Sequence, residues 1–368
     1  MQRIVKASIN ERRQIFQTVA AKMHISQEMV EKDFWVCRTL QNIFQNENLR
    51  KILRFKGGTS LSKVFHLIQR FSEDIDLILD WRCVTDENPL LSRSNTKQDN
   101  FNKNIQEISG KYISGILLQM IAAVIDSECS IKPDERDNHV LLLEYPKTFS
   151  ASYIIPHIRL EIGPLAAWLP NQEFAITPYI GEQFPHLGLP AISIPTILAE
   201  RTFWEKVTIL HQEHFRPDQL NVPSRYSRHY YDLFMMSKSA VKESAVKNIQ
   251  LLEQVVDFKK KFYPRGWAHY DLAVPGSIEL LPPDHSLYFL QRDYLAMKSM
   301  IYGNYPQWDD ILQSLTTLQD ELNSVAVAAD GISAMRELSA ISQANGNSEM
   351  TLDEINTEIV AARESKKQ

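Results

Sequence analysis

The sequence predicts an α+β protein in which a small mixed sheet with flanking helices is followed by a mostly helical C-terminal domain. Short apolar runs that alternate with polar residues, a pattern typical of β-strands, gather between residues 46 and 165. From Ile194 onward, apolar residues instead recur at helical spacing almost to the end of the chain. With 368 residues, the chain is long enough for two domains that each bury a core.

Changes in composition divide the chain into five segments. A helical segment, residues 1–45, precedes the sheet domain at residues 46–165. Residues 166–193 are rich in proline and glycine, which predicts a linker or crossover. The helical C-terminal domain then covers residues 194–342, and we expect residues 343–368 to form a loosely held polar tail.

The composition is that of an ordinary globular protein, with 44% hydrophobic and 23% charged residues. The formal net charge of -5 does not indicate a nucleic-acid partner. Any nucleic-acid-binding surface must therefore be a local group of basic residues. Cys37, Cys83 and Cys129 form no CxxC motif, which favours reduced thiols over a disulfide framework or a zinc site. The N-terminus lacks the apolar core of a signal peptide, and no apolar run is long enough to cross a bilayer. We therefore expect a soluble cytoplasmic protein without membrane contact.

The N-terminal region, residues 8–45, has the pattern of two helices, and Ser26 can cap the second. Three consecutive charged residues, Glu31, Lys32 and Asp33, lie inside this second helix. The simpler interpretation is a solvated helix face with ordinary ion pairs. The alternative is that this helix flanks a nucleotide pocket.

The stretch Arg54–Asp80 is the centre of the predicted fold. Lys51–Phe55 has the pattern of a short strand, and Gly57–Gly58 can make a tight turn after it. Thr59–Ser60 can then cap a helix that runs to about Arg70. A glycine turn that opens a helix offers free backbone N–H groups and the helix dipole to a phosphate group.

A second strand is predicted at Asp74–Leu79, where acidic and apolar residues alternate. Because successive side chains point to opposite faces, Asp74 and Asp76 would share the open face, about 7 Å apart. Two parallel carboxylates repel each other unless a cation lies between them, and Mg²⁺ in proteins takes one or two carboxylates together with substrate phosphates. A phosphate-binding turn followed by a metal-binding D-x-D motif is the minimal equipment for nucleotidyl transfer.

The rest of the sheet domain is predicted to contain one long helix, Phe101–Ser127, and two strands, His139–Tyr145 and Ser152–Ile162. We expect these two strands to pair with each other and with the first two. Each of them carries one acid among apolar residues, Glu144 in the earlier strand and Glu161 in the later one.

A group of cations lies between residues 201 and 229, in a protein that is acidic overall. Triphosphate or RNA backbone would be a suitable counter-ion for such a group. Lys206 borders the buried side of its predicted helix, so it could instead be a structural lysine that extends its amine toward water. The group contains Arg201, Lys206, His211, His214, Arg216, Arg225, Arg228 and His229, against Glu205, Glu213 and Asp218.

Cations and aromatic rings also alternate in residues 258–270, a composition suited to stacking on single-stranded nucleotides. The alternative is that these aromatic residues pack inside the helical domain while the lysines lie in water. Residues 285–325 predict at least two further amphipathic helices. The weaker candidates for RNA binding are Arg225, Arg228, Lys259, Lys260 and Lys261.

The run KGGTSLSK followed by RFSEDIDL resembles the nucleotidyltransferase signature of the DNA polymerase β superfamily, hG[GS] and then [DE]-x-[DE]. Within that superfamily the chain is most similar to the AbiEii/AbiGii toxins of abortive-infection and toxin–antitoxin systems, which include the mycobacterial MenT toxins. Val30–Leu40, Ala199–Glu213 and Ser227–Leu233 also resemble this family, so the similarity covers most of the chain.

The resemblance implies a polymerase-β-type catalytic domain at residues 46–165 and gives roles to single residues. Lys206 and Asp232 match the family's functional lysine and aspartate. Lys206 would bind triphosphate oxygens, and Asp232 would orient Lys206 or Arg228 or act on the acceptor hydroxyl. A third carboxylate commonly comes from a later strand, which favours Glu161 over Glu144. The implied catalytic residues are Asp74, Asp76, Lys206 and Asp232; the metal ligands are Asp74, Asp76 and Glu161; and the nucleotide-binding residues are Lys56, Gly57, Gly58, Thr59, Ser60, Ser72 and Lys206.

In functional terms, the resemblance implies a toxin that uses Mg²⁺ or Mn²⁺ and an NTP to modify RNA. The expected acceptor is the 3′ end of tRNA, where added nucleotides would block translation, and the expected partner is a cognate antitoxin protein. Two alternatives remain from the sequence. One is nucleotidylation of a protein or small-molecule hydroxyl, and the other is a catalytically silent nucleotide-binding interaction module.

Overall fold

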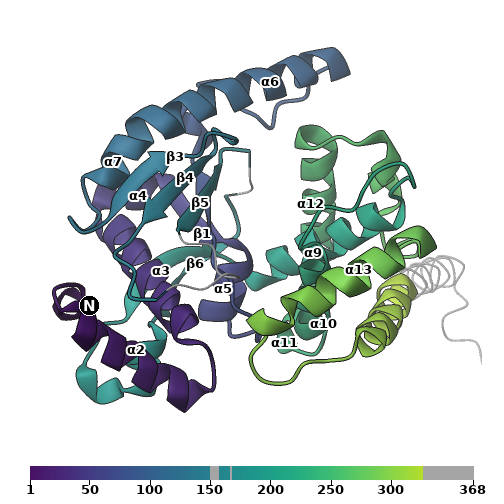
Figure 1. Ribbon diagram of the computed structural model, residues 1–368. Coiled ribbons are helices and arrows are strands. Elements are labelled where there is room, and N and C mark those ends of the chain that lie inside the picture. The colour runs from purple at the N-terminus through teal and green to yellow at the C-terminus, as the bar shows by residue number, and fades with distance from the viewer. Residues whose placement is uncertain (150–156, 166–167, 326–368) are drawn as a thin grey trace, which may run out of the picture.

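The computed structural model describes residues 1–149, 157–165 and 168–325. A seven-stranded sheet and the N-terminal helices form one side of the molecule, and the C-terminal helices form the other (Figure 1). The predicted α+β class, a mixed sheet followed by helices, is confirmed. The predicted polar tail lies outside the described residues.

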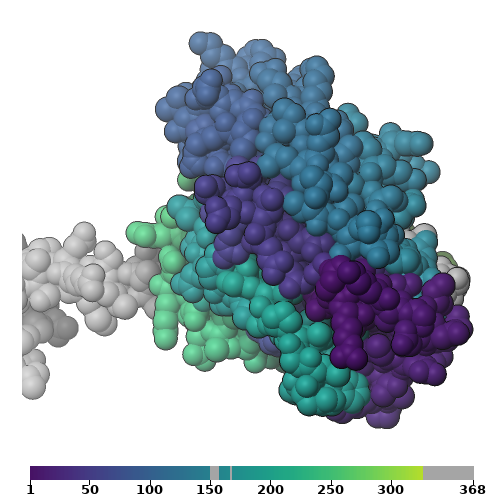
Figure 2. All heavy atoms as spheres, turned by 90° about the vertical axis from the view of Figure 1, so that its left-hand side faces the viewer, coloured from purple at the N-terminus to yellow at the C-terminus, as the bar shows by residue number. Residues whose placement is uncertain are grey.

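The N-terminal region is helical as predicted. Ser8 and Glu11 form a capping box that starts α2, and the Ser26 hydroxyl accepts a hydrogen bond from the Met29 N–H at 3.3 Å to start α3. Figure 2 shows these helices, in purple, beside teal residues of the segment that contains α8 (Tyr179–Gln183). The first helices are α1 (Gln2–Val5), α2 (Ile9–Met23), α3 (Gln27–Gln45) and α4 (Glu47–Ile52).

The sheet has the strand order β3-β4-β5-β2-β1-β7-β6, with β1 and β2 near its centre. Strands β1 and β2 are antiparallel, β2 is parallel to β5, and β5 is antiparallel to β4. The two later strands pair with each other as predicted, and β5 pairs with β2, but neither of them pairs with β1, whose other neighbour is β7. The strands are β1 (Leu53–Lys56), β2 (Ile75–Leu79), β3 (Ser130–Pro133), β4 (Val140–Glu144), β5 (Ile158–Gly163), β6 (Asn171–Ile176) and β7 (Ile192–Ile197).

Residues 166–193, predicted to form a linker or crossover, contain regular structure that completes the sheet. This region contains β6 and α8, and β7 begins at Ile192. Strand β7 is antiparallel to β6 and parallel to β1, where Thr196 lies opposite Phe55. The many prolines and glycines of the segment lie largely in its turns, and they obscured two short strands.

Two predicted helices have different bounds in the structure. Helix α5 (Gly57–Lys63) begins at the glycine pair itself and ends well before Arg70, so Thr59 and Ser60 are not its caps. The long helix begins at Asn95 rather than Phe101, in α6 (Asn95–Tyr112). It continues without interruption through a π-helical turn, Ile113–Leu117, into α7 (Leu118–Ala122).

The C-terminal region is helical from Ala199 onward, whereas helix was predicted from Ile194; residues 194–197 belong to β7. A further helix covers residues 308–325, so the two helices predicted for residues 285–325 are confirmed. In the described residues, no helix is long and apolar enough to cross a membrane. The labelled helices here are α9 (Ala199–His214), α10 (Ser227–Ser237), α11 (Ala240–Val246), α12 (Ile249–Phe262) and α13 (Asp284–Ala296).

Two hydrophobic cores lie side by side. One joins the sheet to α2 and α3, and the other joins the C-terminal helices. Helix α5 directly follows strand β1 of the sheet. Nevertheless Leu61 of α5, and Ile68 in the segment after α5, are buried in the second core. The segment with the glycine pair is therefore fixed to both cores, at the place where the sheet meets the helices.

Candidate active site

The glycine pair at the start of α5 is required by close packing as well as by backbone conformation. Gly57 has φ +84°, and a Cβ atom on it would lie 1.9 Å from Oδ2 of Asp76. A Cβ atom on Gly58 would lie 2.8 Å from Arg70 Nη2 and 2.8 Å from Ser72 Oγ. Only glycine lets the turn approach these side chains so closely.

The two hydroxyl residues after the glycines are engaged inside the protein. Thr59, which is buried, donates its hydroxyl hydrogen to the carbonyl oxygen of Asp74. Ser60 is also buried and donates to the carbonyl oxygen of Gly57 at 2.8 Å. These bonds fix the turn against the strand that carries the aspartates. Of the predicted nucleotide-binding hydroxyls, Ser72 is the one that lies on a cavity surface.

The predicted acids come together on neighbouring strands. Asp74 immediately precedes β2, and Asp76 lies within it. Asp76 is opposite Lys56 of β1 on one side and opposite Glu161 of β5 on the other. Glu144, the competing candidate for a third acid, is an exposed residue of β4 whose carboxylate pairs with Lys132 at 3.0 Å. The register therefore brings Glu161, and not Glu144, next to the aspartates.

In this acid cluster, burial and neighbouring carboxylates outweigh the nearby positive charges. The Oδ1 atom of Asp74 is buried and has no hydrogen-bond partner among the described residues. Burial and the neighbouring carboxylates of Asp76 and Glu73 raise the pKa of Asp74. Burial, Asp76 and Asp74 raise the pKa of Glu161 to about 7, although Arg159 lies 3.5 Å from its carboxylate. Such shifts are those of buried carboxylates that lie close to other acids.

These acids fit a divalent cation that is completed by substrate. Among the described residues, no group of three or more His, Cys, Asp or Glu side chains is already arranged around a common metal position. A site that shares its metal with nucleotide phosphates does not need such a group, because Mg²⁺ then takes only one or two protein carboxylates. The orphaned oxygen of Asp74 and its raised pKa fit this type of site.

Lys206 and Asp232 form a buried cluster with an arginine that sequence reasoning missed. Asp232 accepts two hydrogen bonds from Arg70, at 2.7 and 2.9 Å, and one from Lys206 at 2.7 Å. His229 Nδ1 lies 2.9 Å from the same lysine amine. Burial alone would raise the pKa of Asp232, but Arg70 and Lys206 hold it well below its usual range. Arg70 directly precedes the FSEDID run, and only the fold brings it to Asp232.

Several other charges of the predicted cationic group are used in ion pairs. Arg201 lies 3.3 Å from Glu205, and Arg216 lies 2.5 Å from Glu213. Arg225 pairs with Glu73 at 2.9 Å, which leaves Arg228 as the arginine of the group that takes part in no ion pair of the described residues.

The charged triplet of α3 is buried, so the prediction of a solvated face was wrong. Lys32 pairs with Glu73 at 2.7 Å, next to Asp74 in the sequence. The Glu31 carboxylate accepts from the N–H of Thr148 at 2.6 Å, and Asp33 pairs with Lys63 of α5 at 3.0 Å. Helix α3 is thus bonded to Glu73, which precedes Asp74, and to Lys63 of α5.

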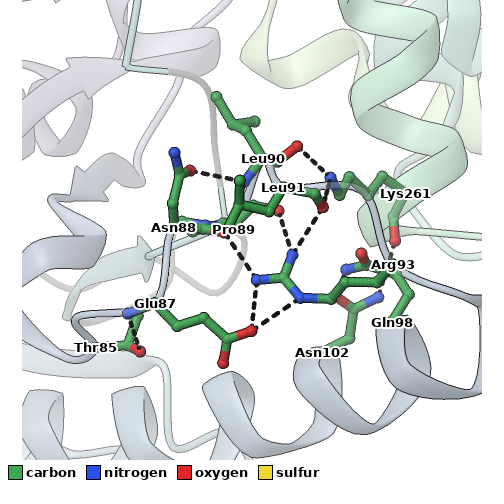
Figure 3. Close-up of polar contacts among 10 residues, drawn as sticks. All are labelled: Thr85, Glu87, Asn88, Pro89, Leu90, Leu91, Arg93, Gln98, Asn102 and Lys261. Carbon is green, nitrogen blue, oxygen red and sulfur yellow. Dashed lines mark hydrogen bonds and ion pairs between the residues drawn. The ribbon is translucent and has the colours of Figure 1, made fainter.

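The basic–aromatic stretch mainly packs against the rest of the protein. Lys261 donates to the carbonyl oxygens of Leu90 and Leu91, both at 2.6 Å, and Arg93 holds the same loop through Glu87 (Figure 3). The rings of Phe258 and Phe262 belong to a small hydrophobic cluster with α6. Burial lowers the pKa of Lys259 to about 7, while Lys260 is exposed. Of the three lysines, Lys260 alone projects freely into solvent.

A cleft of about 460 Å³ opens beside the acids, and we call it the Glu161 cleft. Besides Glu161, its lining includes Lys56, Asp76, His139 and Tyr263. The Lys56 amine lies 3.9 Å from Glu205, which raises the pKa of Lys56 and keeps it charged. The cleft therefore brings a permanent cation and two acids to one solvent-accessible surface.

Comparison with known proteins identifies the family of this chain. A family model described as "Nucleotidyl transferase AbiEii toxin, Type IV TA system" matches residues 38–314. The class defined by the fold and this match is a nucleotidyltransferase. More particularly, the chain belongs to the AbiEii family of nucleotidyltransferase toxins from type IV toxin–antitoxin systems.

Solved structures give weaker similarities. MenT4, a nucleotidyltransferase toxin from Mycobacterium tuberculosis, is 14% identical, with a TM-score of 0.42 over 83% of this chain and 99% of that one. JHP933 from Helicobacter pylori is 13% identical, with a TM-score of 0.34 over 82% of this chain and 99% of that one. A search of curated proteins finds no significant match. The family assignment therefore rests on the match to residues 38–314.

Proposed function

We propose that this toxin transfers a nucleoside monophosphate from an NTP to the 3′ end of tRNA and thereby blocks translation. The observation that carries the proposal is the register that sets Asp76, two residues after Asp74, opposite Glu161. In this cluster, burial and neighbouring acids raise the pKa of Asp74 and of Glu161, and one oxygen of Asp74 has no hydrogen-bond partner among the described residues. Family membership supplies the reaction type. The tRNA acceptor is what the resemblance to this family of toxins implies.

The acids would hold Mg²⁺ or Mn²⁺ as substrate arrives. Asp74, Asp76 and Glu161 are the candidate ligands, and the metal would neutralise charge on the phosphates and on the attacking and leaving oxygens. In the reaction, an acceptor hydroxyl oxygen bonds to the α-phosphorus, and the bond to the oxygen that bridges to the β-phosphorus breaks. Pyrophosphate leaves with the electron pair, and the hydroxyl proton passes to water.

Lys206 and Arg70, the buried cations, would be held in place to stabilise the negative charge of the leaving pyrophosphate. Asp232 fixes the Lys206 amine at 2.7 Å and Arg70 through two hydrogen bonds, so neither cation has to be ordered when substrate binds. Lys56 lies opposite Asp76 and adds a second lysine from the sheet side. Among the three roles open for Asp232, this geometry supports the orientation of Lys206.

RNA is the favoured acceptor, and an antitoxin is the expected protein partner. The Glu161 cleft is open and offers Lys56 together with the half-exposed ring of Tyr263, a combination suited to an RNA end. A tRNA acceptor also places the activity in the cytoplasm. The type IV family implies a cognate antitoxin.

The test is incubation of the purified full chain with total tRNA, Mg²⁺ and each labelled NTP in turn, beside an Asp74→Ala control. Label in tRNA from one nucleotide, lost in the control, is the expected result. Label in a protein or small molecule instead of RNA would replace tRNA by another hydroxyl acceptor. Bound nucleotide without transfer to any acceptor would favour a catalytically silent binding module.

A further inference from the structure

A mainly apolar groove of about 530 Å³ lies beside the Glu161 cleft, and none of the predicted catalytic, metal-binding or nucleotide-binding residues lines it. Trp81, just beyond the end of β2, belongs to its lining, as do Trp168, beyond the end of β5, and several residues of α12. We call it the tryptophan groove. Pro164 lines both this groove and the Glu161 cleft, so the two hollows adjoin.

Hydrogen bonds tie the walls of the tryptophan groove to one another. The loop after Trp81 includes Leu90, whose carbonyl oxygen accepts from Lys261 Nζ of α12 at 2.6 Å (Figure 3). Tyr263, which lines the Glu161 cleft, donates its hydroxyl hydrogen to the carbonyl oxygen of Leu165 at 2.8 Å. Lys261 thus shapes the wall of the groove, and the walls are in place before any ligand binds.

The surface of the groove suits a flat aromatic ligand. Trp81, Trp168 and Phe258 all contribute to it. The Trp168 ring is held by Arg54, whose guanidinium carbon lies 4.1 Å from the ring centroid. Leu169, also in the lining, is 65% exposed, so part of this apolar surface is left uncovered. Accessible aromatic rings beside a catalytic cleft are the surfaces on which nucleobases stack.

Two polar side chains of α12 can select among the bases. Gln254 and Asp257 are three residues apart, so they lie on one side of the helix; both are exposed and both line the groove. Neither makes a hydrogen bond or an ion pair within the described part of the chain. A carboxylate accepts a hydrogen bond from the exocyclic amine of cytosine or adenine, whereas it repels the carbonyl oxygens of uracil.

We propose that the tryptophan groove binds one unpaired nucleobase of the acceptor RNA, close to the reacting 3′ nucleotide, and selects a base with an exocyclic amine through Asp257. This inference rests on the proposed function, in which the Glu161 cleft receives the RNA end. A strand that enters this cleft passes Pro164 and reaches the groove along one surface. Because a paired base cannot enter the groove, the acceptor must carry a single-stranded 3′ end.

The experiment measures binding of fluorescently labelled hairpin RNAs to the full chain by fluorescence anisotropy, without NTP so that no transfer occurs. Each hairpin carries an unpaired 3′ end in which one base at a time is removed to leave an abasic nucleotide. In wild type, loss of one particular base should weaken binding about tenfold, the order of magnitude of one stacked base. Trp81→Ala should bind the intact hairpin about tenfold more weakly, and removal of that base should then matter by no more than about twofold.

Asp257→Asn tests the choice of base with little risk to the fold, because Asp257 is exposed. Wild type should bind the hairpin with cytosine at the sensitive position about tenfold more tightly than the hairpin with uracil there. The asparagine, which can also donate, should reduce this preference to about twofold or less. As a matched control, Tyr288→Ala removes a 70% exposed ring from α13 and should change neither measurement.

The outcomes separate this inference from the proposed function. Equal binding of intact and abasic hairpins by wild type would overturn the inference, while label transfer to tRNA would still support the proposed function. If Trp81→Ala keeps its RNA affinity but loses a non-transferable NTP analogue, the groove holds the donor base and the inference fails. If it keeps its RNA affinity but loses self-association in size-exclusion chromatography, the groove is a protein interface and the inference fails as well. If wild type neither binds nor labels RNA, both proposals fail together.

Discussion

Asp232 and Glu161 are carboxylates of the same site in opposite surroundings. Asp232 is buried between Arg70 and Lys206, which keep its pKa well below the usual range. Glu161 lies beside Asp76 and Asp74, and its pKa rises to about 7. Asp232 thus has two closely bonded cations, whereas Glu161 has one arginine at 3.5 Å and two neighbouring acids.

The difference indicates which part of the site is finished before substrate arrives. The Asp232 cluster is complete, so it acts as a rigid support. The acid cluster carries repulsion that an added cation can relieve, which makes metal binding favourable there. Substitutions in the Asp232 cluster should therefore mainly lower the free energy of unfolding. Substitutions in the acid cluster should mainly lower activity.

The largest effect is expected from Asp76→Asn. The amide keeps the size of the side chain but removes a charge from the acid cluster, so RNA labelling should fall by about 10²–10³-fold or more. The fold should be retained, because the neighbours of Asp76 across the strands are Lys56 and Glu161, and the asparagine fills the same space. Labelling at the wild-type rate would mean that the acid cluster is not the reactive part of the site.

Asp232→Asn should act mainly on stability. The change leaves Lys206 and Arg70 buried without their carboxylate, which should cost about 3–5 kcal/mol of the free energy of unfolding. Urea denaturation followed by circular dichroism measures this loss. A loss below about 1 kcal/mol would show that the cluster is weaker than its geometry suggests, in the range of exposed ion pairs.

Glu161→Gln should lower activity and raise stability in metal-free buffer. With a folded-state pKa of about 7 against an ordinary 4.5, Glu161 binds its proton more tightly in the folded chain. Its charge therefore reduces stability as pH rises from about 4.5 through 7, and the glutamine avoids that loss. The melting temperature of the variant minus that of wild type, in EDTA, should increase between pH 5 and pH 8. A constant difference would contradict the crowded-acid interpretation.

The smallest effect is expected from Thr59→Val, which tests how the acid cluster is positioned. The valine keeps the shape of threonine but loses the hydrogen bond to the Asp74 carbonyl oxygen. The free energy of unfolding should drop by about 1 kcal/mol, and the Michaelis constant for NTP should rise. Loss of stability without any change in that constant would show that the bond has only a structural role.

Much of this site could be predicted because its residues follow one another in the sequence. Asp74 and Asp76 occupy alternate positions of one strand, and the glycine pair ends the preceding one, so local patterns are sufficient. Glu161 could be only a candidate, because strand pairing, which no local pattern records, decides between it and Glu144. The pairing of β5 with β2 brings Glu161, and not Glu144, opposite Asp76.

What the sequence could not show depends on long-range packing. Arg70 looks like an ordinary helix-end cation until α10 brings Asp232 to it, 162 positions later. The triplet of α3 looks solvated because three charges in a row are usually exposed, but each finds a partner inside the protein. The strands β6 and β7 were missed because prolines and glycines around them indicated a linker.

Because α5 is packed into both hydrophobic cores, the chain cannot be split cleanly into a sheet half and a helical half. The helix begins at the end of β1, and Leu61 and Ile68 lie in the core of the C-terminal helices. Cutting the gene between the sheet region and the helices would leave each half with an incomplete interior. Two such halves, produced together, should be active only when they assemble into one protein. Nucleotidyl transfer should therefore be absent when either half is produced alone and should return when both are present.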